Sequence, residues 1–177
     1  AVDNSILLEL GISGRGLLAE NTHVGPMHPE YAELPPLKHD PAGAKALMDE
    51  AGMGDFEHEL FSIDDNWRKD TTDAVAAQLR DAGIKVKRTI LPGSTFWNDW
   101  TKYSFSSTNW NARPLGVQIW ALAYRSGEAW NEFGWSNADF DAKLEMALAT
   151  ADVEKRRAIV KEMAAMVQDE GVTIQPY

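Results

Sequence analysis

A strand–helix–strand pattern in the first half of the chain constrains its fold more than any other sequence feature. The stretches FEHELFSI (56–63) and IKVKRTIL (84–91) alternate apolar and polar residues, and a period of two is typical of half-buried strands. Between them, DTTDAVAAQLRDAG (70–83) brings Val75 and Leu79 to one side of a helix. Strand, helix and strand form a βαβ unit, in which the crossover is right-handed and the strands are parallel. The pattern therefore predicts an α/β fold.

Further elements are expected on both sides of this unit. Residues 40–52 carry the strongest helix signals, because Asp40 can cap the helix, Pro41 suits its first position and Leu47 lies on its apolar face. Residues 16–36 read as a long loop, which is typically functional or held by a neighbouring element. We expect other helices at 1–11, 94–103 (capped by Ser94), 137–150 and 152–171, and other strands at 104–110 and 171–177.

Both ends of the sequence look like the edges of a larger fold. AVDNSILLELGISG (1–14) begins as a helix with no cap before it and with Gly11 as a stop signal. GVTIQPY (171–177) reads as a strand with no closing element after it. We therefore expect residues 1–177 to form a single excised lobe, truncated at both ends.

Composition excludes several classes of function. Lys and Arg number 17 against 27 Asp and Glu, and a net charge of -10 argues against nucleic acid as a partner. The chain has no cysteine, so it has neither a disulfide framework nor a thiolate site. Its apolar runs fall well short of the roughly 20 residues that a membrane helix requires.

A metal site is conceivable in the long loop, where ENTHVGPMHPEY offers two imidazoles and a carboxylate. His23, His28 and Glu30 are all suitable ligand types for zinc. However, Pro26 and Pro29 prevent a helix there, and the spacing matches no helical ligand pair. We therefore expect these histidines to form hydrogen bonds or face solvent, and we expect no metal.

Catalytic signatures are equally weak. Asp64 and Asp65 could form a carboxylate pair for acid/base chemistry, but adjacent acids at the end of a strand are typical of a turn. The glycines of GISGRG follow no strand, so they do not predict phosphate binding. Ser5, Ser13 and Ser62 lack a nucleophile-elbow pattern. We expect no catalytic residue and no cofactor, and a small hydrolase using His23 or His28 with Asp64 stays open as an alternative.

Seven tryptophans are the unusual feature of the composition. Trp110 differs from the others because it ends a predicted strand, and ligand sites of open α/β sheets lie at the carboxyl ends of strands. Arg113 adds a planar fork of donors and Asn111 adds both a donor and an acceptor, so the three suit a small polar ligand with an apolar part. The alternative is a surface loop in which Arg113 pairs with an acid. We expect core or edge packing for the rest: Trp67, Trp97, Trp100, Trp120, Trp130 and Trp135.

A carbohydrate-binding module is a second alternative. Trp97, Trp100 and Trp110 would then form a planar stacking surface. Such modules are mostly all-β, whereas this pattern is rich in helices.

The sequence as a whole resembles the C-terminal lobe of the family 5 extracellular solute-binding proteins. These are the dipeptide- and oligopeptide-binding components of ABC transporters. The resemblance covers nearly the whole chain, and its most specific stretches are DPAGAKALMDEAG (40–52), QLRDAGIKV (78–86) and WSNADFDAKLEMA (135–147). It implies a periplasmic-binding-protein-like lobe, with a mixed sheet flanked by helices, and a receptor rather than an enzyme.

The resemblance also implies partners and a location. A missing N-terminal lobe would close over a peptide or similar solute, and a membrane permease of the ABC type would receive that solute. The protein would be a monomer in the periplasm or outside the cell, and a signal or lipid anchor would lie outside these residues.

One position departs from the family pattern. In many peptide-binding relatives the loop after the "GW" strand carries an aspartate that pairs with the α-ammonium group of the ligand. The corresponding stretch here is NWNARP (109–114), and Arg113 stands about where that aspartate would be. A positive charge cannot pair with an ammonium group, so we expect a solute with a carboxylate or another anionic or carbonyl group near Arg113, stacked on Trp110.

Overall fold

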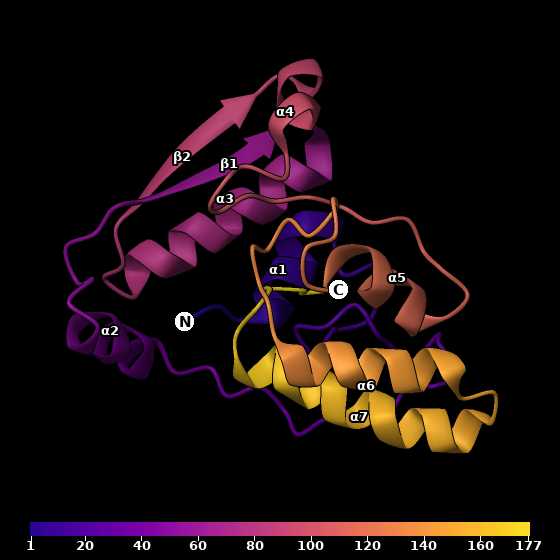
Figure 1. The fold of residues 1–177 in the computed structure, drawn as a ribbon. Coiled ribbons are helices and arrows are strands. Elements are labelled where there is room, and N and C mark those ends of the chain that lie inside the picture. The colour runs from indigo at the N-terminus through magenta and orange to yellow at the C-terminus, as the bar shows by residue number, and fades with distance from the viewer. The chain divides into compact units, whose positions relative to one another are not determined.

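The computed structural model describes residues 1–177, and the chain forms two compact units (Figure 1). The first unit consists of Ala1–Leu18, Leu37–Asn109 and Pro176–Tyr177. The second consists of Ala19–Pro36 and Trp110–Gln175. The single lobe expected over residues 1–177 is thus made of two units, each with its own set of helices.

The predicted βαβ pattern is confirmed in the first unit. Strands β1 (His58–Ile63) and β2 (Val86–Leu91) are parallel, and the register pairs their first residues with each other and likewise their last. Helix α3 (Asn66–Asp81) connects them and begins four positions earlier than expected, with Asp65 as its N-cap residue. The α/β class is correct, and the sheet, which was expected to be mixed, consists here of these two parallel strands.

The strand expected at 104–110 is wrong. Ser106 forms one isolated parallel bridge with Phe61, through bonds from the Phe61 amide to the Phe105 carbonyl (3.0 Å) and from the Ser107 amide to the Phe61 carbonyl (2.9 Å). Beyond the bridge, Asn109 accepts a side-chain hydrogen bond from Arg68 Nε at 2.8 Å. Residue 109 is therefore held by the side chain of Arg68, and not by the backbone hydrogen bonds that would have extended the strand.

Helix α1 (Asn4–Ile12) has the cap that the sequence reading missed. The Asp3 carboxylate accepts a hydrogen bond from the Ser5 amide at 2.8 Å. Gly11 does not stop the helix, which ends at Ile12 and is followed by the C-cap residue Ser13 in the left-handed conformation (φ 55°). Instead, a Cβ on Gly11 would lie 2.2 Å from Thr71 Oγ1, so the glycine allows α1 to approach α3 closely.

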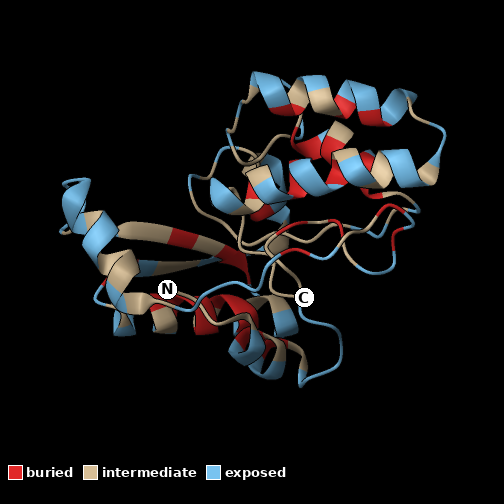
Figure 2. Cartoon of the chain, turned by 90° about the horizontal axis from the view of Figure 1, so that it is seen from below, coloured by how far each residue is buried: buried red, intermediate tan, exposed pale blue.

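The first unit also contains helices α2 (Pro41–Glu50) and α4 (Gly93–Asp99). Asp40 caps α2 as expected, by accepting from the Gly43 amide at 2.9 Å. No residue of α2 is buried, however (Figure 2). Leu47 is 68% exposed. Helix α4 follows Pro92 and has no side-chain cap, so Ser94 does not have the predicted role.

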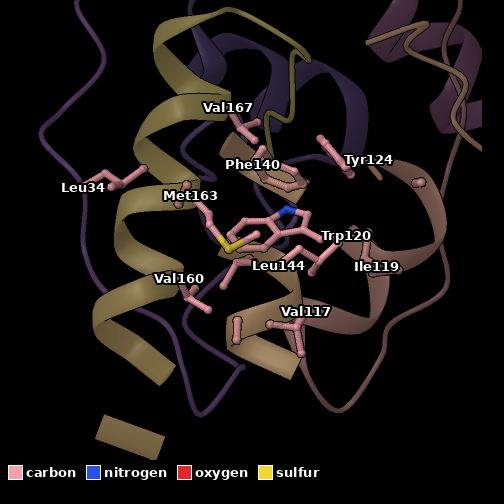
Figure 3. Packing of buried hydrophobic residues seen from close by; sticks show 14 residues of the cluster. Leu34, Val117, Ile119, Trp120, Tyr124, Phe140, Leu144, Val160, Met163 and Val167 are labelled. Carbon is pink, nitrogen blue, oxygen red and sulfur yellow. The ribbon is translucent and has the colours of Figure 1, made fainter. Parts of the chain in front are cut away.

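The second unit is a packed set of three helices. Helices α6 (Ala138–Ala149) and α7 (Val153–Asp169) match the prediction closely, whereas α5 (Gly116–Ala123) was not predicted. The three helices enclose the fully buried ring of Trp120, which lies among side chains of α6 and α7 (Figure 3). The core cluster comprises Val24, Leu34, Val117, Ile119, Trp120, Ala123, Tyr124, Phe140, Leu144, Ala147, Val160, Met163, Ala164 and Val167.

The strand expected at 171–177 is absent, and Gln175 pairs with the long loop instead of with a sheet. The Asn21 amide donates to the Gln175 carbonyl (3.3 Å), and the Gln175 amide donates to Asn21 Oδ1 (3.2 Å). Gln168 Nε2 adds a bond to the Glu20 carbonyl at 3.2 Å. As predicted for a loop of its length, the loop is held by neighbouring elements.

No helix of the chain has the length and apolar character needed to cross a membrane.

Candidate functional site

The predicted site residues Trp110, Asn111 and Arg113 all lie in the second unit, on the segment that leads into α5. Trp110 is partly buried, and its ring packs against the core cluster. Its Nε1 donates to Glu132 Oε1 at 2.8 Å, and its ring centroid is 5.9 Å from that of Trp130. The indole is thus fixed at its N–H edge.

Arg113 is the unusual member of the three. The side chain is partly buried, and its Nε is enclosed without a hydrogen-bond partner. No carboxylate forms an ion pair with it, although the chain has 27 acidic residues. The alternative in which Arg113 merely pairs with a surface acid is therefore not observed. A partly desolvated guanidinium without a counter-ion is poorly satisfied by the protein alone.

The start of α5 fixes the position of this segment. Leu115 occupies the N-cap position and has no side-chain oxygen to satisfy the free amides of the first turn. Glu30, which is fully buried, supplies that acceptor from the long loop: its Oε1 accepts from the Val117 amide at 3.3 Å. Gly116 contributes through its size, because a Cβ there would lie 2.5 Å from Val24 Cγ2.

His23 lies beside the Trp110 ring. The two ring centroids are 6.3 Å apart at an angle of 75°, and the ring centroid of Phe133 is 6.4 Å from that of His23. His23 Nδ1 is 2.5 Å from the hydroxyl of Tyr124. Burial, with a smaller contribution from His28, lowers the pKa of His23 to about 4. Burial, together with the charge of Glu132, raises the pKa of Tyr124 well above 10.

The metal hypothesis is not supported by the geometry. His28 Nδ1 accepts from the Gly25 amide at 3.0 Å, Glu30 caps α5, and His23 contacts Tyr124. No group of three or more His, Asp or Glu side chains converges anywhere in the chain.

Two of the catalytic candidates, Asp65 and Ser62, have structural partners. Asp65 forms an ion pair with Arg68, whose guanidinium lies 4.6 Å from the Trp67 ring centre. The hydroxyl of Ser62 is buried, donates to the Ile63 carbonyl and accepts from Arg88. Neither arrangement places a nucleophile beside a base.

A planar carbohydrate platform is not formed either. The rings of Trp97 and Trp100 are 6.1 Å apart but inclined at 63°, so they do not present one flat surface. Trp97 and Trp130 are 40% and 48% exposed, whereas Trp120 is fully buried. Of the tryptophans for which core or edge packing was expected, Trp120 thus lies in the core, whereas Trp97 and Trp130 lie at more exposed positions.

Sequence reasoning missed the residues that surround Trp110. The sequence suggests His23 only as a metal ligand or as a catalytic residue of a small hydrolase, and Trp130 only as a packing residue. Glu132 and Glu30 had no assigned role, because each acts on a residue that is distant in the sequence. The density of aromatic residues in WNEFGW (130–135) was the one available signal.

The sequence and the fold were compared with those of known proteins. A sequence profile of the bacterial extracellular solute-binding proteins, family 5 middle, matches residues 1–132. Among curated protein sequences, none matches significantly. The fold matches many solved structures, of which three illustrate the range.

The first is the oligopeptide-binding protein AppA from Bacillus subtilis in complex with a nonapeptide, with 19% identity and a TM-score of 0.80 over 96% of this chain. The second is the dipeptide-binding protein from Pseudoalteromonas sp. SM9913 in complex with Met-Leu, with 22% identity and a TM-score of 0.81 over 97%. The third is the murein tripeptide binding protein MppA of Escherichia coli, with 17% identity and a TM-score of 0.85 over 97%. The chain spans 38%, 36% and 36% of these proteins, respectively.

Proposed function

Because the chain belongs to the family 5 extracellular solute-binding proteins, we propose that it is the C-terminal lobe of the binding component of an ABC importer. Its work is binding and release rather than chemistry. A second, N-terminal lobe closes over the solute, as in other two-lobed receptors, and the closed form delivers the solute to a membrane permease. The protein acts as a monomer in the periplasm or outside the cell.

The solute contacts the segment from Trp110 to Arg113. The observation that carries this assignment is the guanidinium of Arg113, which is partly buried three residues after Trp110 in the sequence and forms no ion pair within the chain. A carboxylate or another electron-rich oxygen group would satisfy the planar donors of the guanidinium. The part of the Trp110 ring that stays exposed contacts an apolar part of the solute, and its N–H edge is occupied by Glu132. Asn111, which is exposed, supplies a donor and an acceptor.

The solute is therefore a small polar molecule with an anionic or carbonyl group. A peptide that enters with its ammonium group toward Arg113 is disfavoured by charge repulsion. A peptide that enters with its carboxylate there, or an acidic amino-acid conjugate, is favoured.

Binding measurements on the full-length protein test this assignment. A thermal-shift screen against peptides, amino-acid conjugates and sugars identifies the solute. Arg113→Ala should then weaken its affinity about 30-fold or more, because a partly buried charge pair loses one partner. Arg113→Lys should recover only part of the loss, since lysine lacks the planar fork.

Arg15→Ala is the matched control. Arg15 is exposed in the first unit, and its Nε donates to the Ile12 carbonyl at 3.2 Å, so its removal should leave the affinity unchanged. If Arg113→Ala binds the solute as tightly as the parent does, the assignment of the site is wrong.

A further inference from the structure

The hydrogen bond between His23 and Tyr124 fixes where the imidazole proton lies. Tyr124 is fully buried, and its hydroxyl has no hydrogen-bond partner other than His23 Nδ1. A buried hydroxyl donates its proton when an acceptor is within reach, and Nδ1 is the acceptor present here. Tyr124 therefore donates to Nδ1, and the neutral imidazole of His23 carries its own proton on Nε2.

The other edge of the ring is free. His23 is partly exposed, and Nε2 makes no hydrogen bond within the protein. Nε2 is not enclosed by the protein, in contrast to Arg113 Nε, so it keeps contact with solvent. The ring itself is held in place by Trp110, Tyr124 and Phe133. An oriented N–H donor thus lies beside the Trp110 ring.

We propose that His23 is a further ligand-contacting residue, whose Nε2–H donates a hydrogen bond to an oxygen of the solute that Arg113 receives. This proposal rests on the proposed function, because it takes Trp110 and Arg113 as the solute-contacting residues. Arg113 supplies the charge and His23 supplies an uncharged, directed donor. The two roles differ because the ring stays neutral near neutral pH, where burial keeps its pKa low.

Nearby groups agree with these roles. Glu132 binds the Trp110 N–H, so the indole does not compete as a donor for the solute. His28 has the same proton arrangement, because its Nδ1 accepts from the Gly25 amide. However, His28 is 8% exposed and makes no ring contact with Trp110. His28 therefore provides an internal reference for His23.

Nuclear magnetic resonance on the ¹⁵N-labelled full-length protein tests the proposal, with benzoate as the probe. Long-range ¹H–¹⁵N spectra should show the proton of His23 on Nε2 and not on Nδ1. Addition of millimolar benzoate should shift the resonances of His23 Nε2, the Trp110 indole and Arg113 Nε together, and should leave His28 unmoved. His23→Gln should weaken benzoate binding about threefold to tenfold, as expected for the loss of one neutral hydrogen bond.

Two variants separate binding from structure. His39→Gln, which changes an exposed histidine of the first unit, should leave benzoate binding unchanged. Tyr124→Phe keeps the buried ring but removes the hydroxyl, so both tautomers of His23 should appear in an otherwise preserved spectrum.

The outcomes distinguish the two proposals. If Trp110 and Arg113 respond to benzoate while His23 does not, His23 is not a ligand-contacting residue and the proposed function survives. A proton on Nδ1 of His23 in the parent also overturns the inference about His23. If none of the three resonances moves when benzoate is added to the full-length protein, both proposals are wrong.

Discussion

At the scale of single residues, three side chains of the second unit have properties that depend on distant contacts. Arg113 is charged and partly buried without a counter-ion. Glu30 is fully buried, and one of its two oxygens caps a helix that begins far away in the sequence. His23 is held neutral by burial and oriented by Tyr124. Each is recognisable only after the chain has folded.

The lowered pKa of His23 predicts a pH dependence of stability. The unfolded chain binds a proton at the ordinary pKa of 6.5, whereas the folded chain does so at about 4. Protonation therefore favours the unfolded state, so this contribution to stability is complete above pH 6.5 and is lost as the pH falls toward 4. The free energy of unfolding should decrease by up to about 3 kcal/mol over this range because of His23.

Urea unfolding at a series of pH values measures this effect. The difference between the parent and His23→Gln should shrink as the pH falls from 6.5 to 4, and His39→Gln should follow the parent throughout. Parallel curves for the parent and His23→Gln would show that the folded chain does not suppress the protonation of His23.

Gly116 predicts a packing effect at the start of α5. In Gly116→Ala, the new Cβ would lie 2.5 Å from Cγ2 of the buried Val24, and one of the two elements must move. We expect a loss of about 1–3 kcal/mol in the free energy of unfolding, measured by urea titration. Val24→Ala should recover part of the loss in the double variant. Gly93→Ala is the control, because the atom nearest to its Cβ is Trp97 Cδ1 at 4.0 Å. An unchanged Gly116→Ala would contradict this close packing.

At the scale of secondary-structure elements, α5 is the piece that joins the loop to the site. It receives its cap from Glu30 and directly follows the segment that carries Arg113. The same helix contributes Trp120 to the centre of the core cluster. Substitutions that disrupt its first turn are therefore expected to affect the site as well as the stability of the second unit.

Glu30→Ala tests the cap. The change leaves the Val117 amide buried without an acceptor, and we expect the free energy of unfolding to fall by about 1–3 kcal/mol. Hydrogen exchange at Val117 should accelerate relative to the parent. Glu33→Ala, at an exposed position in the same loop, should stay within about 0.5 kcal/mol of the parent. Equal effects of the two substitutions would rule out a capping role for Glu30.

The elements differ in how well their sequences predict them, and the reason is physical. Helices α6 and α7 and the βαβ unit were predictable because capping residues and apolar periodicity are local signals. Helix α5 was missed because its cap comes from a residue that is 87 positions away. The strands expected at 104–110 and 171–177 do not form. A strand needs a neighbouring strand for its backbone hydrogen bonds, and alternation of apolar and polar residues does not reveal whether one is present.

The candidate site shows the same limit. Trp110, Asn111 and Arg113 could be selected from the sequence by their chemistry and their neighbourhood. Their surroundings could not be selected, since His23 reaches Trp110 across 87 positions of the chain. The absence of an ion pair at Arg113 is also a property of the fold and not of the local sequence.

At the scale of the whole molecule, the proposed function rests on family membership and on the share of the relatives' length that the chain covers. The family profile covers residues 1–132, and the chain corresponds to 36–38% of the three solute-binding proteins described above. A binding site that two lobes share is incomplete in one of them. The account therefore predicts that the 177-residue chain alone has little affinity for the solute.

Calorimetry on the 177-residue chain checks this expectation. The solute found with the full-length protein should bind the isolated chain with a Kd of about 1 mM or weaker, because most of the buried contact area is missing. Micromolar binding to the chain alone would show that the second lobe is not needed.

The central claim is that the solute contacts the segment from Trp110 to Arg113. A crystal structure of the full-length protein with its solute bound tests this claim most directly. The account predicts an oxygen group of the solute within hydrogen-bond distance of the Arg113 guanidinium and an apolar part against the Trp110 ring. A bound solute that touches neither residue would contradict it.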